Sequence, residues 1–149
     1  MNDEAKQRAL KILEKRDVSR RMLIDKLTEK AVSEADAEEI ADWLCSLGVI
    51  DDARFAGMVV RHYAGKGYGT RRIREELYRR GIDRDLWDAA FEEMPETDDT
   101  VFRLLSARLR GDASPENLQR AQNYLLRRGY AWEEIRAAAE RYLSGKDTP

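Results

Sequence analysis

Three glycines and a following arginine pair in the middle of the chain raise the question of phosphate binding. The stretch His62–Leu77 reads HYAGKGYGTRRIREEL, with Gly65, Gly67 and Gly69 within five positions. A P-loop needs a glycine, four further residues and then Gly-Lys-Ser/Thr, but here the Gly-Lys pair is followed by Gly67. The dinucleotide-binding pattern needs a last glycine where Thr70 stands, and a strand before it. Neither nucleotide pattern fits this stretch.

A turn between two helices explains the glycines better. We expect Gly65 or Gly67 to end the preceding helix with a positive φ, and Gly69 to begin the next one. The tip of this turn would present Lys66 and Tyr68, either as partner contacts or as solvent-facing turn residues.

Other residue types that carry catalysis or bind metals are isolated in this sequence. His62 is the only histidine, and the single cysteine, Cys45, falls on an apolar helical stripe. The carboxylates of Glu75-Glu76 point to different helix faces, and Asp51-Asp52 caps the helix that follows. We therefore expect no catalytic residue, no metal, no cofactor and no enzyme activity.

Composition predicts an all-α fold. Of 149 residues, 38% are charged and only 3 are proline, while Ala, Leu, Glu and Arg are abundant. The longest apolar run, Ala56–Val60, is far shorter than a membrane span, and the charged first residues lack an apolar signal core. With one cysteine, the chain is expected to be a cytoplasmic protein without membrane contact.

Charge is segregated along the chain. The net charge is -2, which argues against a general nucleic-acid coat protein. All charges from 34 to 52 and from 85 to 99 are acidic, whereas residues 61–84 carry 8 Lys and Arg against three acidic residues. This pattern predicts a basic surface flanked by acidic ones, although alternating solvated helix faces would also produce it.

A repeat runs through the sequence. Asp51–Phe55 recurs as Asp98–Phe102, and Arg79–Ile82 recurs as Arg127–Tyr130. A period of roughly 47 to 50 residues is typical of repeat proteins. We predict three tandem three-helix repeats (residues 1–50, 51–95 and 96–149) that stack into one elongated body.

Helical spacing and capping residues place the elements. The middle repeat is predicted to form helices over Asp52–Ala64, Thr70–Arg80 and Asp83–Glu93. Further expected features are N-caps at Ser19, Asp36, Asp83 and Ser114 (with Pro115 at the first helical position), a left-handed end at Gly48, core positions for Leu77, Trp43, Trp87 and Trp132, and a frayed tail from Gly145.

The arginines near the middle turn are the main candidates for partner contact. Arg72, Arg79 and Arg80 fall mainly off the stripe of Ile73 and Leu77, so we expect them to face solvent. The full set of candidates for contact with a partner or with DNA is Lys66, Tyr68, Arg71, Arg72, Arg79, Arg80, Arg127 and Arg128.

Several of these segments together resemble the signature of the RecX family, regulatory proteins of the recombinase RecA. The segments are GVIDDARFA at 48–56, KGYG at 66–69, Arg72-Ile73, Glu76-Leu77 and Arg80-Gly-Ile82. Ser19 with Lys26-Leu27 resembles the motif of the family's first repeat. The resemblance covers nearly the whole chain and is densest from Gly48 to Ile82.

The resemblance implies a fold and a function. It implies a curved, elongated monomer of three three-helix repeats that lies in the groove of the RecA–DNA filament and bridges RecA protomers. There it would inhibit ATP hydrolysis, strand exchange and the co-protease role in the SOS response to DNA damage. Many members are basic, whereas this chain is mildly acidic, so we expect contact with single-stranded DNA inside the filament and weak or no binding to naked DNA.

Two other classes stay open at the level of sequence. Helix pairs such as Ser19–Leu47 could serve a helix-turn-helix transcription regulator, although the loops are irregular and no dimerisation segment is evident. The phosphate contacts in that case would be Arg71, Arg72, Arg74, Arg79 and Arg80. A structural adaptor built from helical repeats is the third possibility.

Overall fold

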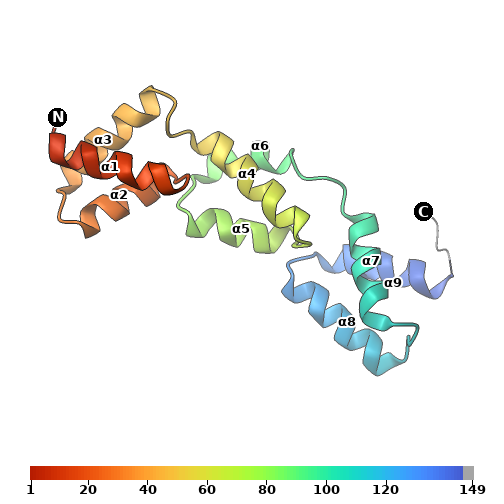
Figure 1. The fold of residues 1–149 in the computed structure, drawn as a ribbon. Coiled ribbons are helices and arrows are strands. Elements are labelled where there is room, and N and C mark those ends of the chain that lie inside the picture. The colour runs from red at the N-terminus through yellow and green to blue at the C-terminus, as the bar shows by residue number, and fades with distance from the viewer. Residues whose placement is uncertain (146–149) are drawn as a thin grey trace. The chain divides into compact units, whose positions relative to one another are not determined.

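The structure, a computed structural model, describes residues 1–145, and within that range it consists of helices and turns without strands (Figure 1). This confirms the all-α fold. In chain order the elements are α1 (Asp3–Lys15), α2 (Arg20–Glu29), α3 (Glu34–Ser46), α4 (Asp52–Gly65), α5 (Thr70–Arg79), the 3-10 helix η1 (Arg84–Leu86), α6 (Trp87–Phe91), α7 (Asp98–Leu109), α8 (Pro115–Arg127) and α9 (Trp132–Leu143).

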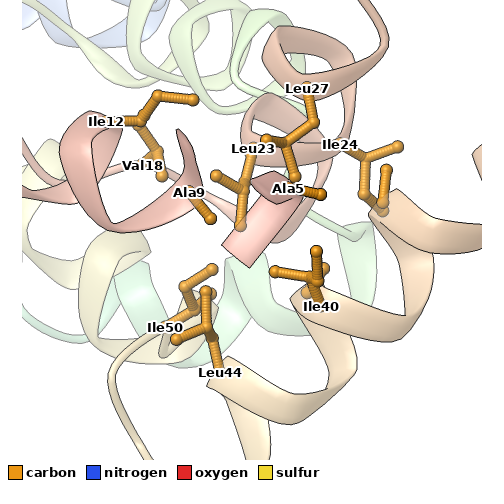
Figure 2. Close-up of a cluster of buried hydrophobic side chains, with 12 residues drawn as sticks. Ala5, Ala9, Ile12, Val18, Leu23, Ile24, Leu27, Ile40, Leu44 and Ile50 are labelled. Carbon is orange, nitrogen blue, oxygen red and sulfur yellow. The ribbon is translucent and has the colours of Figure 1, made fainter. Parts of the chain in front are cut away.

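The first repeat closes around an apolar core. Figure 2 shows side chains of α1, α2 and α3 pointing toward one another, with Ile50 closing the cluster from the chain that follows α3. Leu23, Leu27 and Ile40 have no exposed surface. Each lies at the three- or four-residue spacing that puts apolar side chains on one helix face, and their burial drives the three helices together.

Capping residues fix where these helices begin and end. The Ser19 hydroxyl accepts a hydrogen bond from the Met22 amide (3.1 Å), which confirms it as the N-cap of α2. The predicted cap at Asp36 is wrong, because Ser33 caps α3 and accepts from the Asp36 amide (3.1 Å). Gly48 follows α3 with φ +75°, as expected for a left-handed helix end.

The first two helices of the middle repeat agree with the sequence prediction to within one residue. Asp51 caps α4 through a hydrogen bond from the Arg54 amide (3.1 Å). Leu77 has no exposed surface, as predicted.

The third helix of the middle repeat differs from its prediction. It begins as the 3-10 turn η1 and ends at Phe91, and Asp83 makes no side-chain cap hydrogen bond. The Leu86 amide instead donates to the Asp83 carbonyl (3.0 Å), the i to i+3 bond that defines a 3-10 turn. The Trp87 indole N–H donates to the Ile82 carbonyl (3.0 Å), which holds the ring against the end of α5.

The third repeat has a core of its own. Side chains of α7, α8 and α9 enclose Leu105, Leu125 and Ile135, and Figure 1 shows these three helices gathered together. Ser114 precedes α8 with Pro115 in its first turn, as predicted, but the Ser114 side chain makes no cap hydrogen bond.

The three tryptophans do not share one role. Trp43 is half-buried against the first core, with the Lys6 ammonium 4.4 Å from its ring centre, and Trp87 is half-buried. The core prediction is wrong for Trp132, which is 44% exposed. It stands in the first turn of α9, while Ile135 and Ala139 fill the core side of that helix.

The chain forms two compact units that each join parts of different repeats. The first unit comprises Met1–Val59 and Glu76–Glu92, and the second comprises Val60–Glu75 and the chain from Glu93 on. Residues of α4 and α5 are therefore divided between the units. The repeat boundaries at 50/51 and 95/96 and the elongated, curved body stay predictions, and the predicted tail lies, after Gly145, outside the described residues.

Candidate partner-binding site

Most of the candidate contact residues gather where the start of α5 meets the end of α8, inside the second compact unit. The Gly69 amide donates to the Arg128 carbonyl (2.8 Å), and the Arg71 amide donates to the Gly129 carbonyl (3.0 Å). The first amides of a helix have no partner within that helix, and the carbonyls after α8 supply one here. We call this contact the second joint.

Two glycines allow the second joint to close. A Cβ on Gly69 would lie 2.5 Å from the Tyr130 nitrogen, and a Cβ on Gly129 would lie 2.4 Å from the Arg72 nitrogen. Gly129 also has φ +96°, which favours glycine. The sequence predicts only that Gly69 begins a helix. The match of Arg79–Ile82 with Arg127–Tyr130 is the sequence signal that these two segments have the same role.

Arg128 fixes the glycine turn. Its Nε donates to the Gly67 carbonyl (2.8 Å) and an Nη donates to the Lys66 carbonyl. Gly67 has φ +84°, whereas Gly65 lies within α4, so Gly67 supplies the positive φ that was expected at one of the two. The glycine segment therefore forms a turn between α4 and α5, as the sequence predicted.

Arginines and tyrosines alternate across the second joint. The Tyr68 ring has the Arg128 guanidinium 4.2 Å and the Arg72 guanidinium 5.4 Å from its centre. The Tyr124 ring has the Arg108 guanidinium 3.9 Å and that of Arg128 5.5 Å from its centre. These cation–π contacts hold the guanidinium groups in place.

The first compact unit contains a related contact, the first joint. The Ser19 hydroxyl donates to the Arg80 carbonyl, so the start of α2 meets the end of α5. Gly81 has φ +68°, and a Cβ there would lie 2.6 Å from the Arg21 Cβ. Ser19 takes the place that Gly69 has in the second joint, in agreement with the repeat.

A buried carboxylate organises the arginines of the first joint. Glu76 is 2% exposed and forms ion pairs with Arg79 (3.0 Å) and Arg80. The side chains of Arg80 and Arg72 are each only 26% exposed, so the prediction that both face solvent is wrong. Arg80 is drawn to Glu76 and Arg72 lies against tyrosines, while Arg79 is 67% exposed as expected.

The structure therefore divides the candidate residues into two sets. Six of them lie at the second joint or on the helix ends that form it: Lys66, Tyr68, Arg71, Arg72, Arg127 and Arg128. Arg79 and Arg80 belong to the first joint. Lys66, Arg71, Arg79 and Arg127 are exposed, whereas Tyr68, Arg72, Arg80 and Arg128 are half-buried.

Burial explains the pKa shifts of three ionisable groups. Burial raises the pKa of the Tyr130 phenol to about 12, beside the second joint. Burial also raises the pKa of Asp52, although the Arg20 amide donates to its carboxylate (2.9 Å), and burial raises the pKa of the Cys45 thiol. Within residues 1–145 no cluster of His, Cys, Asp or Glu could hold a metal ion. No helix in that range has the length and apolar character that spanning a membrane requires.

Repeated three-helix arrangements joined at helix ends define a helical-repeat protein. Comparison with known families sharpens this class. The pattern described as "RecX, first three-helix domain" matches residues 5–44, and "RecX, second three-helix domain" matches residues 51–90. The chain belongs to the RecX family.

Individual relatives extend over most of the chain. "Regulatory protein RecX" of Xanthomonas oryzae pv. oryzae is 38% identical over 135 residues, which are 89% of this chain and 84% of the relative. The protein of the same name from Cronobacter sakazakii is 35% identical over 144 residues, with 87% of each chain covered. The crystal structure of RecX from Lactobacillus salivarius has a TM-score of 0.83 at 22% identity, covers 93% of this chain and 94% of its own, and supports the fold alone.

Proposed function

We propose that the protein binds the RecA–DNA filament and restrains RecA, lowering its ATP hydrolysis, strand exchange and co-protease activity. The observation that carries this proposal is family membership over nearly the whole chain, including both recognised three-helix domains. The name "Regulatory protein RecX" belongs to the relatives, and its meaning for this chain is part of the proposal.

The proposed mode of action is binding rather than catalysis. The protein would act as a cytoplasmic monomer without a cofactor, contact RecA and reach single-stranded DNA within the filament.

The two joints separate candidate residues that can contact a partner from those that hold the surface in place. Lys66, Arg71 and Arg127 are exposed and suited to direct partner contact. Arg80 is held by Glu76 and would act by positioning the surface, whereas Arg128 would both hold the glycine turn and contact the partner.

Co-sedimentation tests the proposal. RecA filaments assembled on single-stranded DNA with a slowly hydrolysed ATP analogue should carry the protein into the pellet until the filament is saturated. Single-stranded DNA without RecA should carry much less of it at moderate salt. Absence from the filament pellet, together with a sequence-specific footprint on duplex DNA, would contradict the proposal and favour a transcription regulator.

A further inference from the structure

The two compact units carry opposite net charge. The first unit has 13 Lys and Arg against 18 Asp and Glu, and the described part of the second unit has 13 against 10. The overall charge of -2 therefore hides a positive second unit. Such a separation indicates surfaces for partners of different charge.

The first joint neutralises its own arginines. Arg79 and Arg80 pair with Glu76, and Arg21 pairs with Asp25 (2.8 Å). Arg20 likewise pairs with Asp42 (2.9 Å). Each positive charge at this joint has a carboxylate within the same unit.

At the second joint Arg72 pairs with Glu75 (4.0 Å), but other cations there have only uncharged acceptors. Arg128 donates to the carbonyls of Gly67 and Lys66, and an Nη of Arg71 donates to the Leu126 carbonyl. These carbonyl acceptors carry no formal charge. Among the described residues, five cations at this joint have no carboxylate within ion-pair distance, and we call them the joint cluster: Lys66, Arg71, Arg108, Arg127 and Arg128.

Arg108 and Arg128 lie against the same Tyr124 ring, and an anionic partner would relieve the repulsion between their like charges. The geometry of the joint cluster favours phosphates. Guanidinium groups fixed against Tyr68 and Tyr124 are already oriented, so little side-chain entropy is lost when their remaining N–H groups bind an anion.

We propose that the joint cluster binds the phosphates of a single-stranded nucleic acid. Cations interleaved with half-buried tyrosines are typical of surfaces that follow such strands, because the bases can contact aromatic rings. An acidic protein segment would neutralise the charge but would not use the tyrosines. Assigning this strand to the DNA of the RecA filament rests on the proposed function, whereas the binding itself does not.

A binding assay without RecA tests this inference. The fluorescence anisotropy of a labelled oligothymidylate is measured against protein concentration over a series of low salt concentrations. The wild type should bind, with an affinity that falls as salt rises. In the double variant Lys66→Gln/Arg127→Gln, the affinity at low salt should fall roughly tenfold, and the logarithmic salt slope should become shallower by about 1.4.

The matched control is Lys15→Gln/Arg16→Gln, which removes the same charge from exposed positions of the first unit. It should change the affinity by less than roughly twofold. The single variant Lys66→Gln should make the salt slope shallower by about 0.7, and unchanged thermal melts check that all variants are folded.

Three results would overturn the inference. These are no oligonucleotide binding by the wild type at low salt, equal losses in the two double variants, and displacement of the oligonucleotide by polyglutamate at an equal concentration of negative charge. The last result would assign the joint cluster to an acidic protein surface. Because RecA is absent, failure here leaves the filament proposal standing, and failure of filament binding leaves this assay unaffected.

Discussion

Tyr130 shows how one residue at the second joint links packing to pH. It follows Gly129 into the core of α7, α8 and α9 and is 2% exposed. Burial disfavours the phenolate and raises the pKa of Tyr130 to about 12, against about 10 in the unfolded chain. Above pH 10 the unfolded state therefore holds fewer protons than the folded one, and the stability that the neutral phenol contributes is lost as pH rises toward 12.

We predict that Tyr130→Phe removes this loss. Between about pH 10 and 12 the wild type should lose up to about 2–3 kcal/mol of unfolding free energy through this group, while the variant should lose that much less. Urea unfolding followed by circular dichroism at a series of alkaline pH values measures the difference. Parallel pH profiles for the two proteins would contradict the assignment.

Glu76 makes a second prediction at the residue scale. Its carboxylate is 2% exposed and is compensated by Arg79 and Arg80. Because a buried charge that loses a partner is costly, Arg80→Gln should destabilise the protein by about 1–3 kcal/mol. If Arg80 faced solvent, as the sequence predicted, the same substitution would cost little stability.

The comparison for Arg80→Gln is Arg120→Gln, an exposed position on α8. That change should stay within about 0.5 kcal/mol of the wild type. Thermal melts of both variants are sufficient, since 1 kcal/mol corresponds to about 2–4 °C for a chain of this size. Equal melts for the two variants would show that Arg80 does not compensate Glu76.

At the scale of elements, the second joint depends on the close approach of α5 to the corner after α8. Gly69→Ala should cost roughly 1–3 kcal/mol, because its Cβ would lie 2.5 Å from backbone atoms of Gly129 and Tyr130. Gly65 is the matched control: it is helical and a Cβ there meets nothing within 4 Å. Gly65→Ala should be neutral or stabilising by up to about 1 kcal/mol.

Chemical denaturation of the two variants decides whether the joint is as tight as the structure has it. A similar loss of stability in both would indicate that glycine matters at these positions for backbone freedom alone. Loss confined to Gly69→Ala is the expected result.

Elements set by local signals were predictable from the sequence. The Ser19 cap and the bounds of α4 and α5 follow from nearby residues, and the structure agrees with them. The 3-10 start of the third helix was not predicted. Asp83 is a residue type that often caps helices through its side chain, but here its carbonyl accepts the hydrogen bond that forms the turn.

Features that depend on side-chain partners or on distant segments were less predictable. Helix periodicity places Arg72 and Arg80 off the apolar stripe but does not say what they contact: Arg80 pairs with the buried Glu76 four residues earlier, and Arg72 lies against the Tyr63 and Tyr68 rings. The close backbone contact of Gly69 with Gly129 joins positions 60 residues apart. The internal repeat was the only sequence signal that indicated it. Six of the eight candidate residues lie at the second joint or on the helix ends that form it, and the contact of all eight with a partner stays a prediction.

At the scale of the whole molecule, the two units contribute different surfaces. The first is acidic with neutralised arginines at its joint, and the second is basic with the uncompensated joint cluster. The proposed regulation of a protein–DNA filament would involve contact with both components, and surfaces of opposite charge would suit those contacts.

The steady-state rate of ATP hydrolysis by RecA on single-stranded DNA tests whether the protein restrains RecA. Adding the wild-type protein should lower the rate to a plateau as the filament becomes saturated. Lys66→Gln/Arg127→Gln should require a higher concentration for the same inhibition, whereas Lys15→Gln/Arg16→Gln should act like the wild type. A RecA rate that stays unchanged at saturating wild-type protein would contradict the account.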